Sequence, residues 1–511
     1  MKRWLCIGFL IVSSLKSATA DTLDQKIFLE RSRGSVYELL QKVSERAQIM
    51  FIYEKGVVRN EQRVKIASGH YTLREAILLI TGEKEMQMRV IGNYLLLYKD
   101  AKEPPATPLT PMAGVASGTI VEGYVKERQT QEPVPYCYIA LEGSGVGTVS
   151  NSDGRFALKV PDSLLHTNVL FNHIGYHSPK IPLSVFLDSK PQVFLDPLSI
   201  QLQEVVVRYV PAQKIIREML ENRTNNYAKD PACFTSFYRE GVEYEGDFAS
   251  LTEGVCQIYK SGLGALDNDQ VKLLKMRNIH NKRYPDSILV KIQAGVRASL
   301  SLDIMHHIPD FLAFDRDQYF SYVRVGMERI DSGMVHVISF EQKREVKEPL
   351  YTGMLYIDVD NKALIKAEFE INPHYIKQAG PTIITKKSKS LDIEVQRVLY
   401  SVSYQRWNEH YWMNHVRGDL QFKIKRKKGL FGSAKKMNAY FEMATCEIDT
   451  DNVKRFSNRE RLPTGQIFSQ THFEYDSDFW EQFNTIVPEQ KITEAITKLL
   501  LTVEKQQSEE K

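Results

Sequence analysis

The stretch GTVSNSDGRFALKV, residues 147–160, gathers oxygen-bearing side chains around a glycine and could be a metal-binding loop. A calcium loop of the EF-hand type needs oxygen ligands at alternate positions and a final carboxylate that binds through both oxygens. Here polar and apolar residues alternate after Gly154, and no further acid occurs up to Val160. An Asp-Gly pair between two alternating runs is instead typical of a tight β-hairpin. The sequence therefore predicts a hairpin turn at Asp153-Gly154 and no metal site.

Two histidine pairs in the C-terminal half could in principle bind a metal, but their spacing argues against it. His306 and His307 are adjacent, so they point to different sides of a helix or a strand. His410 and His415 are five residues apart in a strand pattern and would face opposite sides of a sheet. We predict no metal ligands among these four residues.

The acids and glycines that could serve catalysis or nucleotide binding also lack the required context. Asp358 and Asp360 share a strand face, but they border a turn, where solvated acids are common. Gly143, Gly145 and Gly147 precede a strand, whereas a phosphate-binding loop precedes a helix. The chain contains no nucleophile elbow, His-Glu-x-x-His helix or Walker loop. The sequence thus predicts no catalytic residue, no cofactor and no enzymatic activity.

One basic stretch, KIKRKKGLFGSAKK at 423–436, holds seven basic residues and no acid between two expected strands. It is either a solvated loop or a contact to anionic lipid head groups, with the basic residues supplying attraction and the apolar tip inserting. The candidate contact residues are Lys423, Lys425, Arg426, Lys427, Lys428, Leu430, Phe431, Lys435 and Lys436.

The N-terminus has the features of a secretory signal peptide. A basic start precedes an apolar run at 4–15 that is too short for an ordinary membrane-spanning helix, and small residues follow at Ala18 and Ala20. Cleavage is expected between Ala20 and Asp21. Cys6 lies inside the apolar run, so we expect no lipid anchor, and the sequence predicts export to the periplasm or the outer membrane.

The composition of the 511 residues is that of a globular protein, with 43% hydrophobic residues and room for about three domains. Removal of the signal peptide leaves basic and acidic residues nearly balanced, which predicts no nucleic-acid partner. Four cysteines remain, without Cys-x-x-Cys spacing, and either a disulfide or buried free thiols would fit. These are Cys137, Cys233, Cys256 and Cys446.

Residues 21–100 repeat a small helix-and-strand pattern. Two capping boxes, Ser35 to Glu38 and Thr72 to Glu75, each open an amphipathic helix, and short apolar strands flank both helices. The resulting β-α-β-β-α-β-β order, with VKIASGHYTLREAILLITG at its centre, resembles the secretin and TonB short N-terminal domain. That resemblance implies a module of the Gram-negative periplasm that makes protein contacts and performs no chemistry.

Residues 101–117 are rich in proline and small residues and predict a linker. Residues 118–207 then give short alternating runs separated by turns, the pattern of a small β-sandwich. A Gly-x-Val opening, a Pro-Val-Pro strand entry at 133–135 and the closing LQEVVVR resemble the carboxypeptidase regulatory-like domain. The resemblance implies an Ig-like sandwich that acts as a structural or binding appendage.

Residues 208–511 predict a β-rich domain with flanking helices. An amphipathic helix starts at 212, and alternating runs beyond residue 316 indicate a long antiparallel meander, whereas 261–316 shows no clear pattern. The hairpin GMLYIDVDNKALIKAEFEI resembles the curved sheets of periplasmic lipoprotein-carrier proteins. EYDSDFWEQFNTIVPE, at 474–489, resembles a closing segment of carboxypeptidase-like regulatory domain proteins of Gram-negative envelopes.

Together these features predict a multidomain fold of mixed α+β, mainly β class: a small βαβ-repeat module, an Ig-like sandwich and an antiparallel C-terminal domain. We expect an exported, non-enzymatic envelope protein that binds or scaffolds a protein or lipid partner, with a link to TonB-dependent uptake or signalling. The alternative is a hydrolase or transferase whose site lies in the C-terminal domain. Neither the partner nor the oligomeric state follows from the sequence.

Overall fold

The structure is a computed structural model of the 511-residue chain. It divides into two compact units, one ending at Thr107 and one starting at Pro108, which are described separately. The predicted signal peptide with its cleavage site Ala20-Asp21, and the predicted linker 101–117, lie outside the described residues. The structure describes 22–47, 49–54, 58–59, 62–84, 86–91, 94–98, 118–187, 189–198, 210–265, 268–281, 284, 291–292, 295–313, 317–330, 333–386, 391–427, 434–451, 453–463, 468–471 and 483–494.

The first unit is a small α/β module whose two helices begin at the predicted capping boxes. In the second box, Glu75 N donates to Thr72 Oγ1 and Thr72 N donates to Glu75 Oε2, which satisfies two of the free amides at the helix start. Both helices bury the predicted apolar faces. The elements are β1 (Lys26–Leu29), β2 (Ser32–Ser35), α1 (Val36–Ala47), β3 (Met50–Glu54), β4 (Arg63–Ile66), β5 (Gly69–Thr72), α2 (Leu73–Thr81), β6 (Gln87–Ile91) and β7 (Tyr94–Tyr98).

The second unit starts with the predicted β-sandwich. One sheet has the order β10-β9-β12-β13, and the other contains β11, β8 and β14, with β14 parallel to β8. Buried residues alternate along β8 and β11, and Phe156 and Phe171 contact edge to face between the sheets. The strands are β8 (Gly118–Glu127), β9 (Tyr138–Leu141), β10 (Gly147–Val149), β11 (Arg155–Pro161), β12 (Asn168–Asn172), β13 (Lys180–Pro182) and β14 (Pro191–Leu195).

The Asp153-Gly154 turn is present, but the predicted hairpin is wrong. β10 pairs with β9 and β11 pairs with β8, so the turn connects strands of two different sheets. Asn151 builds the corner, because its Oδ1 accepts hydrogen bonds from the backbone N–H groups of Asp153 and Arg155. Gly154 has φ of 72°, which permits this reversal without steric cost.

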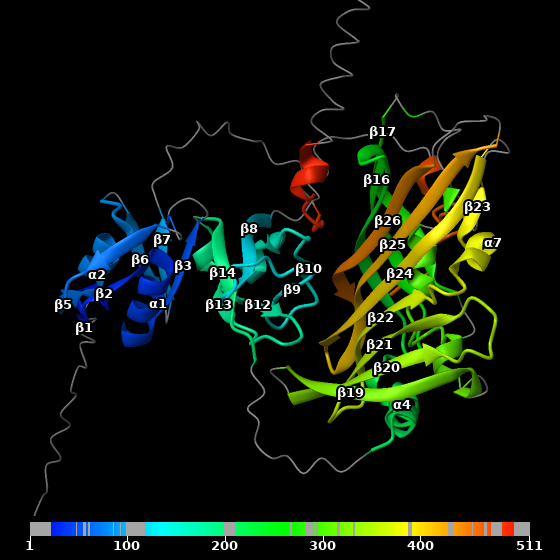
Figure 1. The fold of residues 1–511 in the computed structure, drawn as a ribbon, viewed down its shortest axis with the longest axis horizontal. Coiled ribbons are helices and arrows are strands. Elements are labelled where there is room, and N and C mark those ends of the chain that lie inside the picture. Colours follow the sequence, from blue (N-terminus) through cyan, green and yellow to red (C-terminus); the bar gives the residue numbers. More distant parts are fainter. Residues whose placement is uncertain are drawn as a thin grey trace, which may run out of the picture. The chain divides into compact units, whose positions relative to one another are not determined.

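The rest of the second unit is built on a ten-strand antiparallel sheet of order β17-β16-β15-β26-β25-β24-β22-β21-β20-β19. The predicted meander forms the part from β19 to β26. Figure 1 shows the strand direction turning strongly between β16 and β19, so the sheet is twisted and curved. The strands are β15 (Ala232–Tyr244), β16 (Asp247–Lys260), β17 (Gln270–His280), β19 (Phe320–Ile330), β20 (Gly333–Gln342), β21 (Tyr351–Asp358), β22 (Leu364–Ile371), β24 (Leu391–Trp407), β25 (His410–Arg426) and β26 (Lys435–Asp449).

The two faces of this sheet bury different cores. One face packs against helices α4 (Ala212–Glu221) and α6 (Val296–Ser301) in the largest apolar cluster of the described residues. Ile215, Ile216 and Met219 of α4 are buried there, as the helical spacing predicts. The opposite face, with Phe237 and neighbouring residues, packs against strands β9 and β10 of the sandwich.

The segment 483–494 ties the sandwich to the large sheet. On the sandwich side, Asn151 Nδ2 donates to the carbonyl oxygen of Val487 at 3.1 Å. On the sheet side, Arg239 Nη2 donates to the carbonyl oxygen of Ile486 at 2.7 Å. Because both bonds reach buried backbone groups of one short segment, removal of either would leave polar atoms without partners.

Candidate functional site

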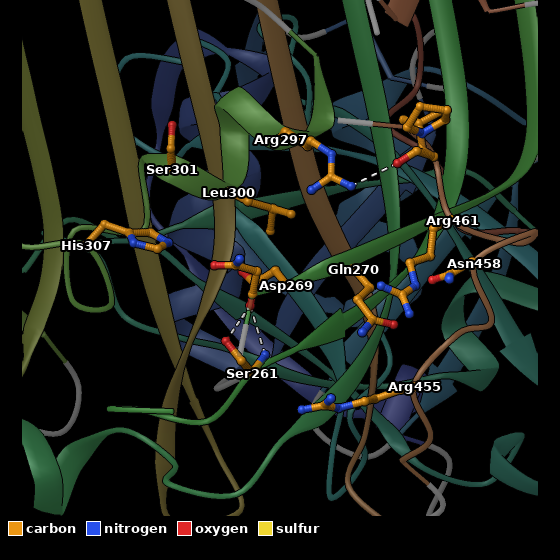
Figure 2. A pocket seen from close by; sticks show the side chains of 13 residues that line it. Ser261, Asp269, Gln270, Arg297, Leu300, Ser301, His307, Arg455, Asn458 and Arg461 are labelled. Atoms are coloured by element: carbon orange, nitrogen blue, oxygen red, sulfur yellow. Dashed lines mark hydrogen bonds between the residues drawn. The ribbon is translucent and has the colours of Figure 1, made fainter. Parts of the chain in front are cut away.

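A pocket of about 760 Å³ opens where β16, β17 and α6 meet the segment that follows β26. Its lining is dominated by polar and cationic side chains, and among the described residues the apolar members are Leu300, Leu462 and Pro463. Figure 2 shows arginine side chains entering from different sides, with Asp269 and Ser261 near the centre of the view. The polar lining residues are Ser261, Asn268, Asp269, Gln270, Arg297, Ser301, His307, Arg455, Asn458 and Arg461.

Lys260 is buried beside the pocket and forms ion pairs with two carboxylates. Its Nζ lies 2.8 Å from Asp269 Oδ2 and 3.0 Å from Asp303 Oδ2. Burial opposes the charged form of this amine, but the two carboxylates hold the pKa of Lys260 above its ordinary value. Burial also favours the neutral form of Asp303, yet Lys260 and His306 keep the pKa of Asp303 well below its usual range. Lys260 and Asp303 are therefore both charged at neutral pH.

Asp269, an acid in the lining, is already saturated with hydrogen bonds. Its Oδ1 accepts from the backbone N–H of Ser261 at 2.8 Å and from the Ser261 hydroxyl at 2.7 Å, while Oδ2 contacts Lys260. Ser301 lies on α6 and its hydroxyl donates to the carbonyl oxygen of Ala298. Both carboxylate oxygens of Asp269 thus have partners inside the protein, and none of these partners is an arginine.

Arg297 and Arg461 keep hydrogen-bond donors that no carboxylate among the described residues occupies. Arg297 donates one Nη2 bond to the carbonyl oxygen of Leu462 at 2.9 Å, and its buried Nε has no partner among the described residues. Arg461 donates from Nε to the carbonyl oxygen of Phe456 at 3.0 Å. Within the part of the chain that the structure describes, neither guanidinium pairs with an acid. The third, Arg455, lies over the ring of Tyr259.

The segment that carries Arg455 and Arg461 is held against β17 by long-range contacts. Leu462 N donates to the carbonyl oxygen of Val271 at 2.7 Å, and Glu460 pairs with Lys272 at 2.7 Å. Phe456 N donates to Gln270 Oε1 at 2.8 Å, which leaves the amide nitrogen of Gln270 as a donor. The exposed arginines therefore sit on a backbone that is fixed to the sheet.

A second cavity, of about 440 Å³, lies between the sandwich and the large sheet. Its charged groups are paired within the protein. Lys366 contacts Glu368 at 2.7 Å, and Arg417 makes two bonds to Asp419 at 2.8 and 2.9 Å. Arg417 also lies over the ring of Tyr136, at 5.5 Å from its centroid.

Beneath this second cavity lies a buried network around Glu442. Arg239, 1% exposed, contacts Glu253 at 2.6 Å and Glu442 at 3.0 Å. Burial favours the neutral acid at Glu442, but His415, Arg239 and Arg417 lower the pKa of Glu442 to about 2. His415 Nε2 lies 3.9 Å from the Glu442 carboxylate, too far for a hydrogen bond. In this network, the carboxylates of Glu253 and Glu442 are thus paired with the guanidinium groups of Arg239 and Arg417.

The predicted basic loop between β25 and β26 is only partly described. Lys423, Lys425 and Lys427 are exposed, whereas Lys428, Leu430, Phe431 and the Arg426 side chain lie outside the described residues. Lys435 contacts Glu245 at 2.9 Å, and the backbone N–H of Lys436 donates to the same carboxylate. Glu245 thus offsets part of the positive charge that the sequence suggested.

The acids and histidines that the sequence offered as candidate ligands lie in different settings. Asp358 Oδ1 accepts from the backbone N–H groups of Asp360 and Asn361 and so closes the turn after β21. His306 contacts Asp303, and its neighbour His307 lines the arginine pocket. In the described parts of the chain, no group of three or more acids, histidines and cysteines could hold a metal ion. Cys137, Cys233, Cys256 and Cys446 are free thiols.

Sequence reasoning missed the arginine pocket. Arg297 falls in 261–316, which showed no clear pattern, and Arg455 and Arg461 come about 160 residues later. The only local signal was the density of arginine around NVKRFSNRERL, at 452–462, which is also normal for a solvated surface.

Residues 121–207 match the CarboxypepD_reg-like domain family, which agrees with the predicted sandwich. No curated protein matches the chain. Among solved structures, it is similar to a DUF1329 family protein from Desulfovibrio piger at 10% identity and a TM-score of 0.20, over 48% of this chain and 93% of that one. Lipovitellin gives 7% identity and a TM-score of 0.20, over 47% and 28%. These TM-scores are too low to carry an argument.

No helix among the described residues is long and apolar enough to cross a membrane.

Proposed function

We propose that this chain is an exported, non-enzymatic binding protein of the Gram-negative envelope whose arginine pocket takes an anionic ligand. The observation that carries the proposal is the excess of cationic groups in the pocket. Arg297 and Arg461 have no acidic partner among the described residues, and the Asp269 carboxylate is already satisfied. Guanidinium groups with free donors in a concave site bind carboxylates, sulfates and phosphates.

The envelope setting rests on the N-terminal features. The signal-peptide pattern at 1–20 supports export. The resemblance of residues 21–100 to the secretin and TonB short N-terminal domain supports a periplasmic position and a protein partner, with a link to TonB-dependent uptake or signalling. On this proposal the first unit binds a protein of the envelope, while the second unit binds the anionic ligand.

Binding is favoured over the alternative, a hydrolase or transferase in the C-terminal domain. A serine nucleophile needs a general base within hydrogen-bond reach. In the pocket, Ser261 donates to Asp269, which is held by Lys260, and Ser301 donates to a backbone carbonyl. Partial burial and the nearby Lys260 lower the pKa of His307. No hydrogen bond joins His307 to either serine in the described residues.

The basic loop at 423–436 supports an additional contact with anionic lipid. Three of its lysines, Lys423, Lys425 and Lys427, project into solvent on one strand end, and each basic residue near a charged surface contributes about 1 kcal/mol. Salt-dependent binding to anionic vesicles that weakens in a Lys425→Ser, Lys427→Ser variant would support this contact. Equal binding to neutral vesicles at low salt would exclude it.

The ligand proposal is tested by thermal unfolding of the full mature chain at low ionic strength with chloride, citrate, sulfate and phosphate. Multivalent anions should raise the Tm above the chloride control, and the Arg297→Gln, Arg461→Gln double variant should lose this increase. If no anion stabilises the wild type more than the double variant, the pocket is not a binding site. N-terminal sequencing of the envelope fraction tests export, with Asp21 expected as the first residue.

A further inference from the structure

We propose that the arginine pocket recognises the phosphomonoester group of a polar organic molecule, an inference that rests on the anion-binding function proposed above. A planar carboxylate is usually satisfied by one guanidinium through two parallel bonds. A phosphomonoester has three terminal oxygens in a tetrahedral arrangement and carries about two negative charges near neutral pH. It therefore suits several guanidinium groups that approach from different directions.

The arginines have this arrangement. Arg297 comes from α6, whereas Arg455 and Arg461 come from the segment that follows β26, and Figure 2 shows the three side chains on different sides of the pocket. The carbonyl of Leu462 fixes one end of the Arg297 guanidinium, and that of Phe456 fixes one end of Arg461. The remaining nitrogens of Arg297 and Arg461 can donate to a ligand, and among them the buried Nε of Arg297 has no partner in the described residues.

The size and polarity of the pocket indicate what the phosphate is attached to. Its volume of about 760 Å³ lies in the range of sites for small organic ligands and exceeds what one phosphate needs. Asn268, Gln270 and Asn458 line the remainder, and amide groups both donate and accept hydrogen bonds. An acyl chain would find few apolar partners here, so the body of the ligand is polar.

The test is calorimetric titration of the full mature chain with glycerol 3-phosphate and with glycerate, which differ mainly in the phosphate and carboxylate groups. We expect glycerol 3-phosphate to bind at least about tenfold more tightly than glycerate. Arg297→Gln and Arg461→Gln should each weaken binding of glycerol 3-phosphate about tenfold or more. Arg397→Gln serves as the matched control, because this exposed arginine is already paired with Glu370 at 2.7 Å.

A second arm distinguishes a soluble ligand from a lipid head group. Vesicles of phosphatidylcholine with phosphatidic acid present the same phosphomonoester at a surface, and binding to them that depends on Arg297 identifies a lipid source. Binding of glycerate as tight as that of glycerol 3-phosphate would overturn the phosphomonoester inference and leave the anion-binding function standing. Failure of every anion, inorganic phosphate included, would overturn both.

Discussion

The two buried charge clusters of the second unit lie on opposite faces of the same sheet. They differ in whether the neighbouring arginines have carboxylate partners. On the sandwich face, Arg239 and Arg417 are matched by Glu253, Glu442 and Asp419, so each guanidinium has a carboxylate partner. On the other face, Lys260 pairs with Asp269 and Asp303, whereas Arg297 and Arg461 near it pair with no acid among the described residues.

The difference separates a structural network from a binding site. Burial of an ion costs several kcal/mol unless a partner compensates it. Each charged group of the sandwich-side network therefore needs an oppositely charged partner. Arg297 and Arg461 stay in contact with solvent and can lack an acidic partner at little cost until an anion binds. Cationic side chains without partners at the mouth of a cavity therefore indicate ligand binding, whereas the paired ones indicate domain packing.

Replacement of Arg239 should give the largest loss of stability. Arg239→Met leaves Glu253 and Glu442 with fewer partners in a buried site, and the free energy of unfolding should fall by about 3–5 kcal/mol. Arg397→Met, which removes a half-exposed pair, should cost less than about 1 kcal/mol. Urea unfolding of both variants decides the matter, and equal losses would mean that burial does not distinguish the two pairs.

The second effect is a pH dependence from Glu442. Its pKa is lowered from 4.5 in the unfolded chain to about 2 in the fold, so its ionised form stabilises the native state. That contribution is fully present above pH 4.5 and disappears as the pH falls towards 2. It amounts to at most about 3 kcal/mol. The stability difference between wild type and Glu442→Gln should shrink across this window, and a constant difference would argue against the depressed pKa.

A smaller loss is expected at the joint between the sandwich and the closing segment. Asn151→Ala removes one buried hydrogen bond to Val487 and two partly buried ones from the backbone of Asp153 and Arg155, and should cost about 1–3 kcal/mol. Limited proteolysis should release the C-terminal segment sooner than in wild type. Asn225→Ala, an exposed control, should leave both measurements unchanged. If Asn151→Ala is digested at the same rate as wild type, the contact between the sandwich and the closing segment does not depend on this side chain.

Local features of the fold were predictable because they depend on neighbours in the sequence. The spacing of Ile215, Ile216 and Met219 predicted α4, and alternation predicted the long meander strands. The Asp153-Gly154 pair correctly predicted a turn, but it did not predict that the two flanking strands belong to different sheets. A turn motif does not specify which strands its flanking residues will join.

The clusters were not predictable, because their members meet only in the folded chain. Arg239 and Glu442 are separated by 203 residues, and Arg297 lies 165 residues from its carbonyl partner Leu462. A lone arginine in sequence carries no sign of whether an acid will compensate it. The pairing that distinguishes packing from binding is therefore a property of tertiary structure.

The smallest change in stability should come from the pocket arginines. Because Arg297 and Arg461 pair with no acid in the described residues, Arg297→Gln and Arg461→Gln each remove repulsion along with one bond to a carbonyl. The free energy of unfolding should change by no more than about 0.5 kcal/mol. If a variant is more stable than the wild type at low salt, that difference should vanish above about 0.3 M salt, where charges are screened. Added phosphate should then stabilise the wild type but neither variant. A loss comparable to that of Arg239→Met, unaffected by phosphate, would mean that these arginines support the fold, and the contrast between the two faces would no longer hold.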